Sequence, residues 1–327
     1  MMHIHGSAAG QDHDASGTGT LRWVNLVDPD ETEIRQLLDL APFDPTFIGH
    51  ALDHHECPRI ENDDDSTIIV IRAPYTETRQ GERRRSTVPI GIIVTPTLLA
   101  TVCRVRDEAI QARLCADTPA QRRACNAGLV QEAQRAQQRI CHVIKEISLL
   151  FMQYLKEISA EIQELEHDLA DTRSNEDLKM LLNLQKTVTY FHSALKTNDF
   201  IIDRIIRRGL SVGTGQKLVF TEEEEDGLDY ALTETRQGIY MSKIFTEVLT
   251  SIANVYSSII SNSLNQIMKA LTSLTVIIMI PTFITSLYGM NVELPFQHST
   301  TAFTIVSGIG IAMTVAVIVI MKLRRIL

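Results

Sequence analysis

Residues 270–287 read ALTSLTVIIMIPTFITSL, and after the tetrapeptide YGMN at 288–291 a second stretch, AFTIVSGIGIAMTVAVIVIM, fills residues 302–321. Neither stretch contains a charged side chain, and each is close to the roughly 20 residues that a membrane-spanning helix needs. Two neighbouring uncharged segments of this length are difficult to bury in a soluble core. The sequence therefore predicts two transmembrane helices, the second covering 302–322, joined by a loop at 288–301.

Basic residues flank the predicted spans on one side only. Lys269 precedes the first span, Lys322, Arg324 and Arg325 follow the second, and the loop between them has no Lys or Arg. Because positive charge accumulates on the cytoplasmic side of membrane proteins, we expect both termini in the cytoplasm, with a short basic tail at 323–327. We expect a multi-pass protein of the inner (plasma) membrane, in contact with lipid and without a cleavable signal peptide.

The overall composition narrows the function classes. A formal net charge of -9 argues against a nucleic-acid partner, because phosphate binding needs clustered Lys and Arg. No Gly-rich phosphate loop, nucleophile elbow or H-E-x-x-H motif is found, so we expect neither an enzyme nor a resident cofactor. The cysteines are odd in number and lack C-x-x-C spacing, which indicates free thiols in a reducing compartment: Cys57, Cys103, Cys115, Cys125 and Cys141.

The N-terminal part predicts a tail followed by a compact domain. Residues 1–20 have no apolar periodicity, so we expect a disordered tail whose His3, His5 and His13 make a poor metal site. Residues 21–108 predict a cytoplasmic α/β domain, with helices in 28–40 and 45–53 and strands at 23–26, 67–72, 87–94 and 98–102. Between two of these strands, the basic run Arg83, Arg84 and Arg85 is expected in a solvated loop.

Helical periodicity replaces the strand pattern after residue 109. Apolar residues recur at steps of three and four on both sides of Ser174 and Asn175, which predicts a long helical hairpin within 109–220 that ends before Gly209. A loop follows at 210–220. The run Thr221 to Glu224 then predicts a capped helix start. No proline or glycine interrupts 239–280, so one stalk helix over 221–290 is expected to continue into the first span.

One face of this long helix is polar inside the predicted membrane. At about 100° per residue, the following side chains share that face: Asn265, Met268, Thr272, Thr275, Met279, Thr282 and Ser286. A polar face in hydrocarbon is costly unless it meets another helix or water. The stripe therefore predicts either a helix–helix interface or the lining of a pore.

The stripe ends in a loop with the chemistry of an ion entrance. Gly289 permits a sharp turn, and Asn291 supplies a neutral amide oxygen at the expected outer mouth. Mg²⁺ dehydrates reluctantly, so side-chain carbonyl oxygens can hydrogen-bond its water shell without stripping it.

These motifs together resemble the signature of the CorA family of magnesium and related cation transporters. The resemblance is carried by residues 265–272, by Thr282, Phe283 and Ile284, and by Tyr288, Gly289, Met290 and Asn291. It extends to 23–26, to 53–61 with Pro58 and Arg59, and to 90–94. It implies a homopentamer with one pore on the five-fold axis, lined by the first transmembrane helix and encircled by the second.

Residue by residue, the resemblance implies a set of pore positions. Asn291 and Gly289 match the outer selectivity ring in the Gly-Met-Asn loop, and Thr282 a polar ring within the pore. Asn265 matches the inner polar mouth. The hydrophobic constrictions would be formed by Met279, Leu271 and Met268, of which Met268 and Leu271 are the gate candidates because a hydrophobic ring can close by dewetting.

Two positions depart from the family pattern. Pro281 immediately precedes Thr282, whereas the family's proline precedes the pore threonine by two residues. The acidic pair that senses intracellular Mg²⁺ is also altered: residues 87–89 replace one acid, and spacing places Asp229 near the other. Asp229 is a candidate metal ligand, together with the acidic run Glu222, Glu223, Glu224, Glu225 and Asp226, for which the alternative interpretation is a solvated helix start.

Two further clusters predict structure more than chemistry. His54, His55, Glu56 and Cys57 are adjacent in sequence, and adjacent residues seldom converge on one ion. The acidic residues Glu157, Glu161, Glu164 and Asp168 are expected on an exposed helix face.

Three functions remain open at this point. The first is passive conduction of Mg²⁺, with Co²⁺ or Ni²⁺ as further cargo. The second is Zn²⁺ transport of the ZntB type, coupled to protons in one version, which His298 and the single loop acid Glu293 keep open. The third is a non-transporting membrane scaffold whose helical hairpin recruits a partner.

Overall fold

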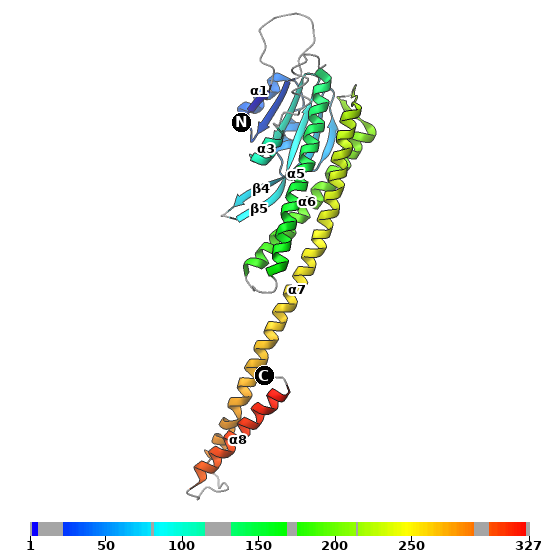
Figure 1. Cartoon of the computed structure of the whole chain (residues 1–327). Coiled ribbons are helices and arrows are strands. Elements are labelled where there is room, and N and C mark those ends of the chain that lie inside the picture. Colours follow the sequence, from blue (N-terminus) through cyan, green and yellow to red (C-terminus); the bar gives the residue numbers. More distant parts are fainter. Residues whose placement is uncertain are drawn as a thin grey trace, which may run out of the picture. The chain divides into compact units, whose positions relative to one another are not determined.

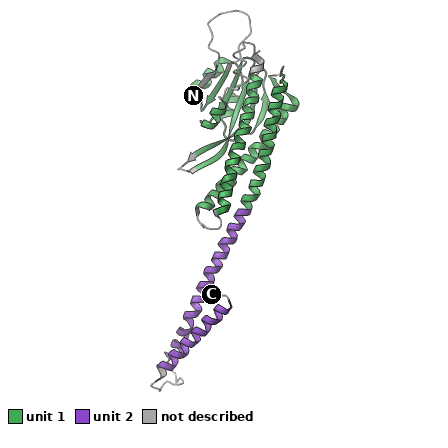
Figure 2. Ribbon diagram, viewed as in Figure 1, with its two compact units in different colours: residues 1–250 green, residues 251–327 purple. Residues whose placement is uncertain are grey.

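The computed structural model describes residues 2–5, 22–79, 82–114, 132–168, 175–213, 215–290 and 301–324. The chain divides into two compact units, Met1–Thr250 and Ser251–Leu327 (Figure 2). The first unit holds the strands and the helices up to the first part of α7 (Glu222–Tyr288). The second holds the rest of α7 and α8 (Ala302–Leu323).

The first unit is built around a six-stranded sheet with the order β1-β2-β6-β5-β4-β3. Its strands are β1 (Met2–His5), β2 (Arg22–Val27), β3 (Arg59–Asn62), β4 (Thr67–Arg79), β5 (Glu82–Val94) and β6 (Leu98–Cys103). Only β2 and β6 pair in parallel; the other neighbours are antiparallel. Between β5 and β6, the Thr95 side chain accepts from the backbone N–H of Leu98 and closes the predicted turn.

One face of the sheet is covered by α1 (Glu31–Leu40) and α2 (Thr46–Leu52). Alternate residues of β4 point to this face, where Ile68 and Val70 pack in one cluster with Leu37 and Phe47. Gly91 of β5 lies so close to α2 that a Cβ there would collide with Ala51. The glycine therefore sets how closely the helix approaches the sheet.

The opposite face packs against α3 (Glu108–Leu114), α5 (Glu132–Asp168) and α6 (Asn175–Arg208) (Figure 1). The rings of Phe151 in α5 and Phe191 in α6 meet edge to face, with centroids 5.3 Å apart. Because both faces are covered here, β4 contains a continuous apolar run at residues 68–71 rather than an alternating pattern. Helix α6 ends before Gly209, which takes the left-handed φ of 70° and donates to the carbonyl of Ile205, as the glycine stop predicts.

The hairpin of β4 and β5 corrects the expected basic loop. These strands pair as far as Arg79 and Glu82, so Arg83, Arg84 and Arg85 lie in β5. The Arg85 guanidinium binds Glu161 and Glu157 of α5. The prediction of a solvated loop was wrong. The predicted exposed acidic face is partly correct, because Glu157 is exposed whereas Glu161 is half-buried against Arg85. The Glu164 side chain is exposed.

Three further elements were not expected from the sequence. Residues Met2–His5 pair with β2, so disorder throughout 1–20 was wrong for this segment. Strand β3 pairs with β4. The stretch expected as a loop at 210–220 contains the small hairpin of β7 (Leu210–Val212) and β8 (Gln216–Leu218), whose Gly213 packs directly on the backbone of Asp64.

Helix α7 (Glu222–Tyr288) is continuous from its start to the end of the first apolar stretch, and α8 (Ala302–Leu323) follows. Within the first unit, α7 is joined to α5 by the hydroxyls of Ser148 and Thr235, 3.1 Å apart. Both α7 and the segment Phe303–Leu323 are long and apolar enough to cross a membrane. Pro281 is accommodated within α7.

Candidate ion pathway

Helix α8 covers one face of α7 in the second unit. Over residues 270–288 of α7, the least exposed side chains are Ser273, Val276, Ile277, Ile280, Pro281, Ile284, Leu287 and Tyr288. They recur at steps of three and four and so form a single face. Pro281 and Ile284 of α7 share a hollow with Gly310 and Thr314 of α8, where a Cβ at Gly310 would lie 3.7 Å from Ile284.

The predicted stripe lies on the other side of α7, which α8 leaves open. Met268, Leu271 and Met279 are 58%, 57% and 65% exposed in the single chain. The polar members of the stripe are exposed as well: Asn265, Thr272, Thr275, Thr282 and Ser286. Large apolar and polar side chains on one uncovered helix face indicate that another helix, another subunit or water must face them in a membrane.

A shallow hollow runs along the outer part of this stripe. Thr275, Met279, Thr282 and Ser286 line it together with Ile278 and Phe283. The structure therefore brings four predicted pathway residues to one surface. Asn265, Met268, Leu271 and Thr272 continue the same face toward the start of the span.

The stripe also continues beyond the residues that we predicted. A second hollow on α7 is lined by Ser251, Asn254, Val255, Ser258, Ile259 and Asn262. Four of these side chains are uncharged and polar, and they follow one another at steps of three and four up to Asn265. The heptad spacing of the sequence carries this signal, because the same polar face continues on the N-terminal side of the apolar segment.

Three stripe threonines hydrogen-bond to their own helix. The hydroxyl of Thr272 donates to the carbonyl of Met268, that of Thr275 to Leu271, and that of Thr282 to Ile278, each at 2.8 Å. Each bond spans one helical turn and removes the need for the hydroxyl proton to find another partner in an apolar surrounding. The threonines thereby fit a long helix in a membrane without breaking it.

The helix ends at the predicted loop. Gly289 donates to the carbonyls of Thr285 and Ser286 and closes the last turn, and Met290 follows it with an exposed side chain. Asn291 lies outside the described residues, as do Glu293 and His298. The structure thus describes two of the three Gly-Met-Asn positions.

The acidic run at the start of α7 serves the helix itself. The Glu224 carboxylate accepts from the backbone N–H of Thr221 and is buried, whereas Glu222, Glu223, Glu225 and Asp226 are exposed. Asp229 is exposed one turn later. Among the described residues, no three His, Cys, Asp or Glu side chains converge to hold a metal ion. The Glu224 bond assigns that residue to capping, and a metal-binding role for the rest of the run and for Asp229 stays a prediction.

The histidine and cysteine candidates are dispersed in the same way. Glu56 pairs with Arg59 at 2.5 Å, while burial and the nearby Arg72 lower the pKa of His54. Cys57 is an exposed thiol, and Cys103 and Cys141 are buried free thiols. Burial raises the pKa of Cys103 to about 11, which makes it inert at neutral pH. Cys115, Cys125 and the side chains of His3, His5 and His13 lie outside the described part.

Comparison with known proteins agrees with this arrangement. A family model described as CorA-like Mg²⁺ transporter protein matches residues 18–325. The cobalt/magnesium transport protein CorA of Methanocaldococcus jannaschii is 28% identical over 304 residues, which cover 92% of this chain and 90% of the relative.

The solved structures agree as well. The complete structure of the CorA magnesium transporter from Methanocaldococcus jannaschii matches with a TM-score of 0.76 and 26% identity, over 98% of this chain and 96% of the other. The ZntB cytoplasmic domain from Vibrio parahaemolyticus matches with a TM-score of 0.52 and 13% identity, over 74% of this chain and 89% of the other, and shares the fold alone. These matches confirm the predicted α/β domain, long helix and two C-terminal apolar helices. The chain belongs to the CorA-like Mg²⁺ transporter family, whose members are divalent-cation transporters of the membrane and not enzymes.

Proposed function

We propose that this chain conducts hydrated Mg²⁺ passively across the membrane, with Co²⁺ and Ni²⁺ as further cargo. The observation that carries the proposal is the uncovered stripe of α7, where hydroxyl and methionine side chains stand exposed opposite the face that α8 covers. The stripe ends at the turn of Gly289, next to the amide-bearing Asn291 of the sequence.

The pathway requires several copies of the chain. A single stripe facing lipid would leave its polar groups in hydrocarbon, whereas copies arranged about one axis turn every stripe toward shared water. We propose a homopentamer with α7 lining the central pore and α8 outside. The name of the Methanocaldococcus relative supports the cargo, and the likeness over almost the whole of both chains supports the shared architecture.

Within this pore, each position has a proposed task. Asn291, with Gly289 and Met290, forms the outer ring that hydrogen-bonds the water shell of the incoming ion. Met279 forms an apolar ring deeper inside. Leu271 and Met268 form the inner constriction, where apolar side chains close the passage by excluding water. Asn265 forms the inner mouth.

The orientation and the boundaries follow from the same proposal. The basic residues Lys269, Lys322 and Arg324 stand at one end of both membrane helices, which supports cytoplasmic termini. The cytoplasmic part would then comprise the tail at 1–20, the α/β domain at 21–108, the helical hairpin at 109–220 and the stalk part of 221–290. The outer loop at 288–301 and the tail at 323–327 would lie on opposite sides of the bilayer.

Two alternatives are tested alongside it. Zn²⁺ transport of the ZntB type, coupled to protons in one version, is the first alternative, for which His298 and the single acid Glu293 of the loop are the sequence features. A non-transporting membrane scaffold would need no water-filled stripe, so the exposed hydroxyls of α7 favour it least.

Uptake by proteoliposomes separates these functions. We expect Mg²⁺ uptake that does not depend on a pH gradient, measured beside Co²⁺, Ni²⁺ and Zn²⁺ with the same preparation. Uptake of Zn²⁺ alone, driven by a pH gradient, would favour the ZntB type, and no uptake of any ion would favour the scaffold. Native mass spectrometry in mild detergent should give five chains, and a monomer would contradict the shared pore.

A further inference from the structure

Two of the stripe threonines are tied to the two gate candidates. Thr272 donates its hydroxyl proton to the carbonyl of Met268, and Thr275 donates to the carbonyl of Leu271. A threonine hydroxyl has one proton and two lone pairs. Since the proton is committed to the helix, the exposed part of each hydroxyl can only accept hydrogen bonds.

An acceptor distinguishes the hydration shells of cations and anions. Water bound to a cation points its oxygen at the ion and its protons outward, so it donates to whatever surrounds the shell. Water around an anion points its protons inward and presents its oxygen, which needs a donor outside. A wall of acceptors therefore stabilises a hydrated cation and leaves a hydrated anion without partners.

The two threonine hydroxyls lie at a defined depth in the proposed pore. They lie one helical turn apart, beyond Leu271 and short of Met279, so they stand between two apolar positions of the open face of α7. At about 1.5 Å per residue, Leu271 and Met279 are separated by roughly 12 Å along α7. All four side chains are exposed on the face that α8 leaves open.

The stripe carries no charged residue that could select for cations instead. Among the described α7 residues of the second unit, the one ionisable side chain of the Asp, Glu, Lys and Arg types is Lys269, and helical spacing places it near the face that α8 covers. A preference for cations at this depth must then come from oriented dipoles.

We propose that Thr272 and Thr275 form a hydration collar just outside the inner gate, which holds a divalent cation with its water shell intact and selects it against anions. This inference rests on the proposed pore and adds a selectivity element at a depth different from the Gly-Met-Asn loop. The threonines act as acceptors because the gate carbonyls hold their protons.

The test compares substitutions that change the collar in two ways. Thr272→Val with Thr275→Val removes the acceptors and keeps the side-chain shape. Thr272→Asn with Thr275→Asn keeps the positions polar but adds N–H donors. Thr272→Ser with Thr275→Ser restores a hydroxyl. The matched control is Thr285→Val, because the Thr285 hydroxyl also bonds its own helix, to Thr282, but lines the hollow shared with α8.

Two measurements are made on the full-length protein in lipid: Mg²⁺ uptake by proteoliposomes, and the reversal potential across a bilayer with a MgCl₂ gradient. We expect the Val pair to lower Mg²⁺ uptake about tenfold, because apolar rings exclude water, and the Ser pair to recover most of it. We expect the Asn pair to conduct while its permeability ratio of Mg²⁺ to Cl⁻ falls at least about threefold. Thr285→Val should retain the wild-type ratio.

The outcomes separate this proposal from the function on which it rests. An Asn pair with the wild-type permeability ratio, or a Val pair with wild-type uptake, overturns the collar while the transport function stands. A loss of uptake as large in Thr285→Val as in the Val pair also overturns it, because the effect would then belong to the helix. Absence of Mg²⁺ uptake by the unmodified protein would instead refute the proposed function.

Discussion

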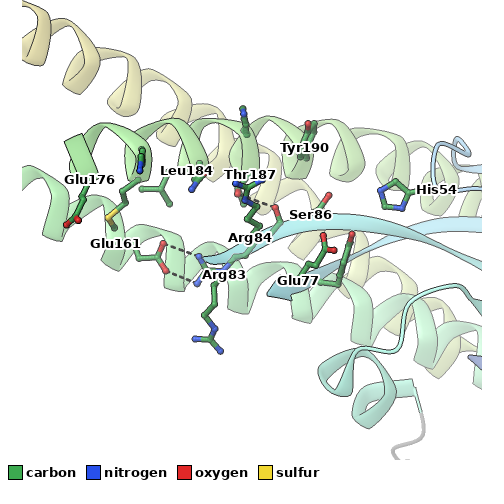
Figure 3. Close-up of a pocket in the computed structure, with 16 residues that line it drawn as sticks. His54, Glu77, Arg83, Arg84, Ser86, Glu161, Glu176, Leu184, Thr187 and Tyr190 are labelled. Carbon is green, nitrogen blue, oxygen red and sulfur yellow. Dashed lines mark hydrogen bonds and ion pairs between the residues drawn. The ribbon is translucent and has the colours of Figure 1, made fainter. Parts of the chain in front are cut away.

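The guanidinium of Arg85 in β5 donates to both carboxylate oxygens of Glu161 in α5, at 2.7 and 3.0 Å. In Figure 3, the dashed lines at the labelled Glu161 mark these two bonds. A third contact reaches Glu157 at 3.3 Å. The Arg85 side chain is only 16% exposed, so on folding its hydrogen bonds to water are replaced by hydrogen bonds to these two carboxylates. This fork fastens the end of the β4–β5 hairpin to the helical layer.

We expect Arg85→Met to destabilise the protein by about 1–3 kcal/mol, the range for losing hydrogen bonds to charged groups. The loss should appear as a lower melting temperature of the full chain in detergent. Arg83→Met is the matched control, because Arg83 is exposed in the same strand. Equal melting temperatures for the two variants would show that the fork contributes nothing.

The close approach of α2 to the sheet gives a second prediction. A Cβ at Gly91 would collide with Ala51, so Gly91→Ala should force α2 away from β5 and cost about 1–3 kcal/mol, as overpacking does. Gly49→Ala is the control, since nothing lies within 4 Å of a Cβ there and alanine favours a helix. In denaturant unfolding, we expect Gly91→Ala to have a lower free energy of unfolding than the wild type. Gly49→Ala should have an equal or higher one.

The pH dependence of stability should include a contribution from His192. Burial, followed by the charge of Lys196, lowers the pKa of His192, whose Nδ1 lies 2.8 Å from the Ser242 hydroxyl. The unfolded chain therefore binds a proton more readily than the folded chain, so this contribution is complete above the unfolded pKa and is lost as the pH falls.

We expect the melting temperature to drop between about pH 7.5 and about pH 5.5, and the drop to be smaller in His192→Gln than in the wild type. The exposed His167 supplies the control substitution, His167→Gln. An equal drop in both variants would assign the pH dependence to other groups.

The gate prediction concerns Met268. Replacing Met268 with Asn should wet the apolar ring and raise the basal flux of Mg²⁺ several-fold, because a dewetted constriction forces an ion to give up hydration without compensation. Ile267→Asn is the control on a different face of α7. If flux in Met268→Asn is unchanged at equal protein level, the constriction lies elsewhere, and the position of Pro281 beside Thr282 becomes the next candidate.

The outer ring gives the last prediction. Asn291→Ala should reduce selective Mg²⁺ uptake about tenfold or more, because the side-chain amide oxygen that hydrogen-bonds the ion's water shell is removed. The oligomer should stay intact, because the residue belongs to the predicted loop and not to the helix packing. Uptake is measured with the same proteoliposomes, and assembly by native mass spectrometry. Normal uptake by an assembled variant would remove this ring from the mechanism.

The sequence by itself determined the two apolar helices, the polar face of α7 and the stop at Gly209. These features depend on residues within a few turns of one another: charge is absent over a whole span, side chains repeat with the helical period, and glycine alone adopts a positive φ without strain. The family resemblance carried by the Gly-Met-Asn loop was confirmed by the match over residues 18–325.

Tertiary structure alone decided how distant segments meet. The pairing of Arg85 with Glu161 joins residues 76 positions apart, and the basic run that supplies it has the local appearance of a loop. Four short strands lie at the edges of the large sheet or in a separate hairpin: β1, β3, β7 and β8. They are stabilised by pairing with neighbouring strands and not by their own strand propensity. The uncovered face of α7 likewise depends on α8. An isolated helix is exposed on all sides, and the packing of α8 against one side decides which side stays open.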